Sequence, residues 1–471
     1  MTIQLTMRRL SVPLAIALGC ALYLADLTGM GLVSADEPRY AEIGREMAAS
    51  GDWITPHLWG KPWFEKPALL YWMTASGFRA GLGPELAPRL PVALVSLAFL
   101  VFFWMAVKAE WGVETAWYAA AMLATSAGWL AYSHAAVTDL PMSAFFSAAV
   151  LLAIARRPRW IPSAVCLAIA ALGKGLVPLV LFAPVLLMNV TAKETRPSRG
   201  CALGAVAAFC AVALPWYVLC TIRNGAEFPR VFFVEQTFGR FNSDALQHAQ
   251  PWWFYLPVGL LLLYPWFPLL GFVKSGALDR RSWTLTAVAI FGLIFFSAMK
   301  NKLPGYLLPL VPGTCALMAI GYVKAGRPAW PVAVAVALLG LLPIAAGVVP
   351  EALANGIRRA HFGGAAVWPW VAIAVGFAFG VAFLVRGFPR FAISATLAAA
   401  ALLRFQFAAF PAIDAAASGR PYWLKYHPDC APAVSRSLLY GLEYYAGRSL
   451  APCGQGSIDR QKSPLYGTER R

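Results

Sequence analysis

Apolar blocks of about 17–22 residues recur from one end of the chain to the other. As a helix, a block of this length crosses a hydrocarbon core roughly 30 Å thick. One such block could be a buried core helix or a cleaved signal peptide, but their recurrence excludes both as a general explanation. Of the 471 residues, 59% are hydrophobic and only 13% are charged, whereas soluble proteins have roughly 25% charged residues. We therefore predict an all-α polytopic membrane protein.

We expect about thirteen spanning helices, the first of them retained because it is too long for a signal peptide and lacks a cleavage site. The expected spans are residues 10–30, 87–107, 113–131, 140–155, 160–173, 175–191, 201–221, 252–272, 283–299, 304–322, 329–349, 365–385 and 390–410.

Short basic connections alternate with longer ones that carry most of the acidic residues. By the positive-inside rule the basic connections are cytoplasmic, so the N-terminus is expected inside and the C-terminus outside. The outer connections are then residues 31–86, 222–251, 350–364 and 411–471. We predict a multi-pass bacterial inner-membrane protein, with a membrane domain over residues 1–410, whose first periplasmic loop is 31–86. A small periplasmic domain follows over 411–471.

The net charge of +17 would suggest a nucleic-acid partner only on a solvated domain, and no such domain is expected on the cytoplasmic side. Anionic membrane lipids are the expected partners, and the protein is expected to act as a monomer. Six of the eight cysteines lie in or beside apolar blocks, where Cys behaves as a small hydrophobe. Cys430 and Cys453 lie in the polar tail and could form a disulfide there.

The first outer loop contains a predicted amphipathic helix that lies along the membrane. Pro38 can open it, because the first helical residue needs no N–H group. Tyr40, Ile43 and Met47 recur at about one-turn spacing. Asp36 and its neighbour precede Pro38, where the helix dipole favours ionised carboxylates. Ordinary helix capping is the alternative explanation for these acids.

Four outer segments carry the chemistry-bearing residues, and they occur in this order: Asp36-Glu37-Pro38-Arg39-Tyr40; Phe64-Glu65-Lys66-Pro67; Tyr132-Ser133-His134 with Thr138-Asp139; and Lys300-Asn301-Lys302-Leu303-Pro304-Gly305-Tyr306-Leu307-Leu308-Pro309. Together they resemble the signature of bacterial aminoarabinose transferases and related protein mannosyltransferase-like enzymes. These are membrane glycosyltransferases of the GT-C type, and the resemblance runs from about residue 10 to about residue 325.

The resemblance implies a GT-C fold and a sugar donor linked to undecaprenyl phosphate. The sugar would pass to lipid A or another envelope glycolipid at the periplasmic face. The leaving phosphate needs cations, and those on the outer side are Lys66, Lys174, Arg240, Lys300 and Lys302. Asp36 is the expected general base or acceptor-orienting group, with Asp139 as a second carboxylate. Arg39, Tyr40, Glu65 and Tyr306 are expected to help form the donor and acceptor pocket.

At three of these positions a purely structural role is the alternative to a role in binding. Lys174 could snorkel at a helix end, the Glu65–Lys66 pair could be a surface ion pair, and Tyr306 could simply pack in the core. A divalent metal is a further expectation, with Glu65, Glu235 and His248 supplying mixed oxygen and nitrogen ligands. Gln236, however, stands where the related enzymes have a Glu-His pair.

Two other functions fit parts of the pattern. A protein O-mannosyltransferase would share the fold but use a protein acceptor. Because the C-terminal tail is short, the sequence defines the acceptor less closely than it defines the donor. A lipid-linked-sugar flippase should carry charges deep in several spans and show repeated broken helices. Here the charges gather in outer loops at the membrane surface, so the sequence favours an enzyme.

Overall fold

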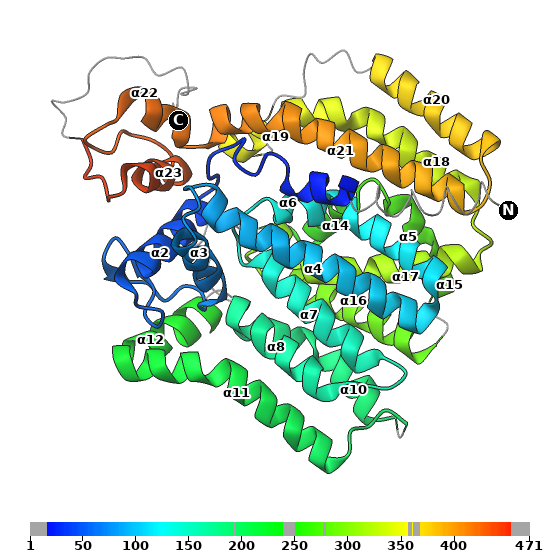
Figure 1. Cartoon of the computed structure of the whole chain (residues 1–471), viewed down its shortest axis with the longest axis horizontal. Helices are drawn as coiled ribbons and strands as arrows, with labels where there is room; N and C mark the ends of the chain where they lie inside the picture. The colour runs from blue at the N-terminus through cyan, green and yellow to red at the C-terminus, as the bar shows by residue number, and fades with distance from the viewer. Residues whose placement is uncertain are drawn as a thin grey trace.

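A computed structural model describes residues 17–192, 194–238, 250–276, 279–356, 360 and 368–453. Arg240 and His248, with the beginning of the first span and the last part of the tail, lie outside these residues. In the described part, the chain is helical apart from loops and one short hairpin (Figure 1). That hairpin pairs β1 (His57–Leu58) with β2 (Lys61–Pro62) in antiparallel register, with His57 opposite Pro62.

In the N-terminal half, helical residues 17–24 precede α2 of the first outer loop, and the last element is the π-helix η1. The bounds of the labelled helices are α2 Asp36–Ser50, α3 Leu69–Arg79, α4 Leu86–Trp111, α5 Val113–Ala124, α6 Ala127–Ser133, α7 Asp139–Ile154, α8 Trp160–Lys174, α9 Val177–Leu181, α10 Ala183–Val190, α11 Arg199–Asn224, α12 Glu227–Pro229 and η1 Arg230–Phe238.

The C-terminal half continues from the short 3-10 helix η3 to two small helices of the tail. The bounds are η3 Trp252–Phe254, α14 Tyr255–Leu262, η4 Phe267–Phe272, α15 Val273–Gly276, α16 Arg280–Ala298, η5 Pro304–Leu310, α17 Val311–Lys324, α18 Ala329–Leu338, η6 Leu339–Leu341, α19 Leu342–Asn355, α20 Trp368–Leu384, α21 Phe388–Ala417, α22 Arg420–Tyr426 and α23 Arg436–Ala446.

Several of these helices are suited to a membrane, as the apolar blocks predicted. Among the described residues, six continuous helical stretches are long and apolar enough to cross one. Four shorter apolar helices, including α7 and α8, coincide with other predicted blocks. The membrane character of the fold is therefore clear, whereas the number of about thirteen spans stays a prediction. The last of the six, α21, continues to Ala417.

The predicted span 252–272 is broken. Its two halves, Trp252–Leu262 and Phe267–Ser275, meet at an angle of 108°. Pro265 lies in the short connection between them, and a proline without an N–H group cannot continue an α-helical hydrogen-bond ladder. The apolar composition of this block was thus correctly recognised, but its shape is a bent pair.

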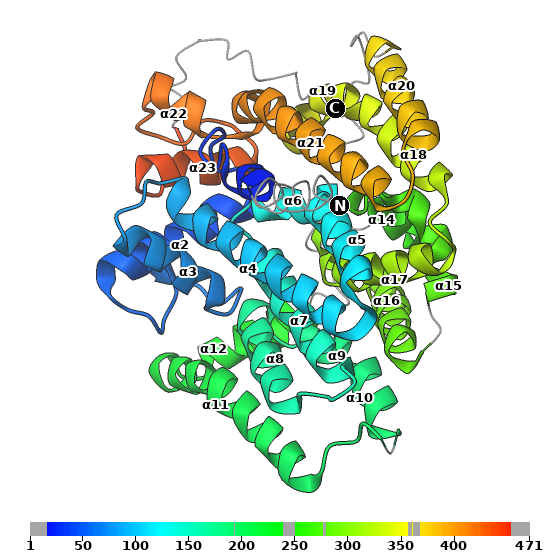
Figure 2. The same ribbon diagram turned by 45° about the vertical axis from the view of Figure 1, so that its right-hand side comes forward.

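The tail packs on the first outer loop, although more than 320 residues separate them in the sequence. Both Figure 1 and Figure 2 show α23 beside α2, and α22 packs on α23. Val33 and Ser418 form an isolated β-bridge between the two regions. Inside the tail, Gly419 approaches Gly441 so closely that a Cβ on Gly419 would lie 2.5 Å from the Gly441 carbonyl carbon. Only glycine therefore fits at position 419 without a shift of the backbone.

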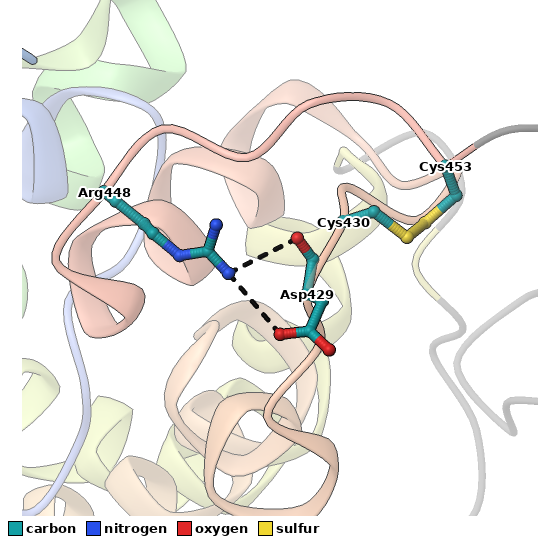
Figure 3. The surroundings of a disulfide bond; sticks show 4 residues. All are labelled: Asp429, Cys430, Arg448 and Cys453. Atoms are coloured by element: carbon teal, nitrogen blue, oxygen red, sulfur yellow. Dashed lines mark hydrogen bonds and ion pairs between the residues drawn. A yellow bond between two sulfur atoms is a disulfide. The ribbon is translucent and has the colours of Figure 1, made fainter.

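A disulfide ties the tail together by joining Cys430 to Cys453 (Figure 3). The same view shows Arg448 reaching Asp429, and its guanidinium lies 3.6 Å from the carboxylate. Both of these side chains are exposed, so the ion pair adds little to stability. The disulfide closes the loop that contains α23, and it restricts the freedom of the tail around that helix.

The helix α2 is buried more completely than an interfacial amphipathic helix should be. The predicted apolar residues Tyr40, Ile43 and Met47 are buried, but so are Arg39 and Glu42. The reason is that α3 and α4 cover one side of α2, while α23 of the tail covers another. A covering element so distant in the sequence cannot be inferred from the periodicity of α2 itself.

Candidate active site

Arg39 is the centre of a charged cluster at the beginning of α2. Its Nη1 donates to Glu65 Oε2 at 2.8 Å, its Nη2 donates to Asp36 Oδ1, and its Nε donates to the carbonyl of Ala35 at 2.7 Å. Burial opposes the positive charge, but the carboxylates of Glu65 and Asp36 outweigh burial and raise the pKa of Arg39. The cation therefore orients two carboxylates that come from different outer segments.

Asp36 and Glu37 are neighbours in the sequence with different surroundings. The side chain of Asp36 is 38% exposed, so it can meet a molecule that arrives from outside. Glu37 is 1% exposed and accepts two hydrogen bonds from Arg89, at 2.7 Å and 2.9 Å. It also accepts from the backbone amides of Val33 and Ala136. Glu37 thus anchors the loop and α2 to α4, and Asp36 is the carboxylate available for chemistry.

The second outer segment follows the β1–β2 hairpin and adds another cation to the cluster. Lys66 Nζ lies 3.4 Å from Glu65 Oε1, and both side chains are largely buried. Glu46 of α2 fixes the hairpin by accepting from the amides of Trp59 and Gly60. The sequence 64–67 is therefore held against α2, and its Glu-Lys pair is more than a flexible surface ion pair.

The third and fourth outer segments meet at Asp139, the first residue of α7. Lys174, at the end of α8, lies 2.5 Å from Asp139 Oδ1, and its ammonium lies 4.6 Å from the centre of the Tyr306 ring. A Cβ on Gly305 would fall 2.5 Å from Asp139 Oδ1 and 2.7 Å from the Tyr132 hydroxyl. Glycine at position 305 therefore allows the two segments to touch.

The second and fourth outer segments, together with Lys174 at the end of α8, line an open hollow. Its lining has a polar part and an apolar part. The polar residues are Glu65, Lys66, Lys174, Gln236 and Tyr306, and the apolar residues are Pro67, Leu176, Val177, Phe232, Phe296 and Met299. Two ammonium groups beside an apolar wall can receive a phosphate that carries a hydrocarbon chain.

Two further residues that were predicted for the site, Tyr40 and Lys302, lie beside its charged groups. Tyr40 is 1% exposed and packs edge-on against Tyr71, with ring centres 5.9 Å apart. The Lys302 ammonium donates to the backbone carbonyls of Gln250 and Met299, and burial lowers its pKa. Both belong to the surroundings of the site, whereas Asp36, Asp139 and the residues named above form its charged interior.

The metal prediction concerns two described residues, Glu65 and Glu235, and His248, which lies outside the described part. Glu235 is paired with Arg230 at 2.9 Å. Glu65 is engaged with Arg39 and Lys66. Within the described residues, no three His, Cys, Asp or Glu side chains are grouped as metal ligands. A metal that uses Glu65 with His248 therefore stays a prediction.

Three residues of this site were not found from the sequence. Arg89 begins an otherwise apolar block, and a charge at such a place was a signal that it has a buried partner. Tyr132 stands in a quoted motif but received no role. Tyr440 belongs to the tail, and its ring lies 5.1 Å from the Arg39 guanidinium. Nothing in the local sequence around Tyr440 points to that contact.

Known proteins resemble this chain in sequence. Residues 68–366 match the model of the Alg9-like mannosyltransferase family. The chain is 33% identical over 319 residues to the undecaprenyl phosphate-alpha-4-amino-4-deoxy-L-arabinose arabinosyl transferase of Edwardsiella ictaluri, covering 64% of this chain and 57% of that protein. The protein of the same name from Pseudomonas aeruginosa (strain UCBPP-PA14) is 31% identical over 321 residues, covering 64% and 58%. The chain thus spans less than two thirds of these relatives.

Solved structures agree on the fold. The crystal structure of ArnT from Cupriavidus metallidurans bound to undecaprenyl phosphate superposes with a TM-score of 0.73 at 23% identity, covering 94% of this chain and 86% of that one. The apo structure of the same protein gives 0.73 at 24% identity, covering 96% and 86%. The resemblance predicted from the four outer segments is confirmed, and because the family model matches more than half of its residues, the chain belongs to the Alg9-like mannosyltransferase family.

Proposed function

We propose that this chain is a glycosyltransferase that moves 4-amino-4-deoxy-L-arabinose from undecaprenyl phosphate to lipid A. The observation that carries the proposal is the hollow beside Glu65, which combines two lysines with an apolar wall. The curated relatives are named as arabinosyl transferases that use an undecaprenyl phosphate donor. Both facts support the same class of donor, a sugar phosphate on a long hydrocarbon chain.

In this reaction the acceptor oxygen attacks the anomeric carbon of the sugar. The bond from that carbon to the phosphate oxygen breaks, and undecaprenyl phosphate leaves with the bonding electrons. Lys66 and Lys174 line the hollow where the charge would develop, and preorganised cations stabilise such charge most when water is excluded. The apolar residues of the same hollow would hold the first part of the hydrocarbon chain.

Asp36 is the group proposed to face the acceptor. It is half-exposed and is held by Arg39, so its carboxylate has a fixed position and remains reachable. If the acceptor is a hydroxyl group, Asp36 takes its proton as general base. If the acceptor is a lipid A phosphate, which is already ionised, Asp36 orients it or binds the amino group of the sugar. Asp139 is paired with Lys174, so its proposed role is to fix that lysine.

We also propose that the protein lies in the inner membrane as a monomer with about thirteen spans. The N-terminus would be cytoplasmic, and the charged site and the tail periplasmic. The alternation of short basic connections supports this orientation. The disulfide between Cys430 and Cys453 also supports it, because disulfides persist in the periplasm and are rare in the cytosol.

A mass spectrum of lipid A tests the proposal. Cells that lack the protein are compared with cells that carry the wild type or Asp36→Asn. We expect a pentosamine-sized addition with the wild type and none with the variant. Lipid A that stays unmodified while the folded wild-type protein is in the membrane would contradict the acceptor and the sugar together. The search would then move to other glycolipids and to periplasmic proteins.

A further inference from the structure

The tail contributes an aromatic ring to the charged cluster. Tyr440 of α23 lies over the guanidinium of Arg39, 5.1 Å from its central carbon to the ring centre. Trp63 and Tyr40 lie at 5.7 Å and 5.8 Å from the same carbon. Three of the five N–H groups of Arg39 donate to Asp36, Glu65 and a carbonyl. The guanidinium carbon lies over the three rings, where cation–π attraction is available.

The position of Tyr440 is fixed by the docking of α23. Arg45 of α2 donates to the carbonyl of Tyr444 at 3.0 Å, and its guanidinium lies 4.7 Å from the Tyr444 ring centre. The Tyr444 hydroxyl donates to the carbonyl of Pro84 at 2.7 Å. The Tyr445 hydroxyl accepts from the amide of Leu32. These contacts attach one helix of the tail to α2 and to both ends of the first outer loop.

We propose that Tyr440 is a positioning residue of the active site. Its ring keeps the Arg39 guanidinium in the position that presents Asp36 to the acceptor. The tail therefore contributes a residue to the active site, although it is short. This inference rests on the proposed glycosyl transfer, because the effect of Tyr440 on rate is defined only for that reaction.

The geometry separates this role from donor binding. The hollow that would receive the donor is lined by residues of the outer segments, α8, α9, η1 and α16, and among the described residues none of its lining comes from α23. Asp36 does not line the hollow either. A change at Tyr440 should therefore act mainly through Asp36, whereas Glu65 keeps its pair with Lys66 and the donor contacts of Lys66 and Lys174 stay in place. The expected signature is a lower kcat with an unchanged donor KM.

The experiment uses the purified full chain in detergent, with undecaprenyl-phosphate-linked aminoarabinose and lipid A as substrates. Tyr440→Phe keeps the ring face, and Tyr440→Leu keeps an apolar side chain without one. We expect near wild-type kinetics for Tyr440→Phe. For Tyr440→Leu we expect kcat to fall about tenfold with the donor KM unchanged, as loss of a partly desolvated cation–π contact would give. Tyr426→Ala is the matched control, because this tail tyrosine packs on Tyr422 and Lys425 instead.

Equal kcat values for the two Tyr440 variants, whether normal or reduced, would overturn the inference. A second measurement reads the same contact without substrate. In a double-mutant cycle of unfolding free energies, Arg39→Met and Tyr440→Leu should be non-additive, whereas additive effects would overturn the inference. If the wild type transfers no sugar but the cycle shows coupling, the proposed function fails and the Arg39–Tyr440 contact stands.

Discussion

Two ion pairs at the beginning of α2 use the same chemistry for different purposes. Asp36 and Glu37 are adjacent, and each binds an arginine. The Glu37–Arg89 pair is shut away from water, with side chains 1% and 0% exposed. In the Asp36–Arg39 pair the arginine is 6% exposed but the carboxylate is 38% exposed. Burial, rather than residue type, therefore separates the pair that holds the loop from the pair that can react.

The hydrogen bonds of the two arginines agree with this division. Arg89 donates to the carbonyls of Leu27, Met30 and Gly31 as well as to Glu37, so it fixes the path of the chain into the first outer loop. Arg39 donates to two carboxylates from different segments, so it arranges charges. A buried ion is costly to leave without its partner, whereas a half-exposed carboxylate remains in contact with water when it changes partners.

Removal of Arg89 should have the largest effect of the changes considered, and that effect should be on the stability of the fold. Arg89→Met leaves the Glu37 carboxylate buried without its cation, which costs about 3–5 kcal/mol of unfolding free energy. The measurement is thermal unfolding of the purified protein in detergent, with the amount of folded protein in the membrane. The double variant Glu37→Gln with Arg89→Met should lose less, because no buried charge remains. A stable Arg89→Met protein would show that Glu37 is not an anchor.

Replacement of Asp36 should give the opposite result. Asp36→Asn keeps the shape and an oxygen that can accept from Arg39, so the unfolding midpoint should stay close to that of the wild type. The rate of sugar transfer should fall about 100-fold or more, because the variant has no carboxylate to take a proton or to orient the acceptor. Initial rates with saturating donor test this. Glu37→Gln is the control, and it should lower stability more than it lowers the rate per folded molecule.

The sequence predicted the parts of this comparison but not the division between them. Pro38 and the apolar spacing correctly predicted α2. The four outer segments supplied Asp36, Arg39, Glu65, Lys66, Asp139 and Tyr306, and Lys174 was predicted separately as a cation on the outer side. The structure brings these residues together. The different fates of Asp36 and Glu37 depend on Arg89, which is 52 residues from Glu37. Two adjacent acids look alike until their neighbours in space are known.

The rest could not be predicted because it depends on contacts between distant segments. The tail was expected as a separate small domain. Tyr444 docks it on α2 and Tyr445 docks it on the two ends of the first outer loop, and these contacts have no signature in either segment. The bend after Leu262 depends on how two short helices pack, although Pro265 marks its place. The periodicity of apolar residues describes one helix at a time. It therefore does not indicate that a distant helix, such as α23, also covers α2.

The Lys174–Asp139 pair extends the comparison, because the exposed fraction of its carboxylate lies between those of Glu37 and Asp36. The side chains are 12% and 16% exposed. Lys174→Met removes a cation from the hollow and leaves Asp139 without this partner, so we expect kcat/KM for the donor to fall about 10- to 100-fold. Lys302→Met is the control, because Lys302 faces backbone carbonyls. An equal loss in both variants would contradict a specific contact between Lys174 and the donor.

Glu42 gives the smallest expected effect. It is another carboxylate of α2, and its burial affects its pKa more than its partner Arg45 does. Burial raises the pKa of Glu42 from 4.5 to about 7, although Arg45 pulls it down. The folded protein therefore holds a proton that the unfolded chain loses above about pH 4.5. The stability due to this proton is complete below that pH and is lost as the pH rises through about 7. Relative to Glu42→Gln, the wild type should lose about 1–3 kcal/mol of unfolding free energy between about pH 5 and about pH 8. Parallel pH profiles for the two proteins would mean that Arg45 keeps Glu42 ionised, and Glu42 would then resemble Glu37 in being a buried charge held by its arginine.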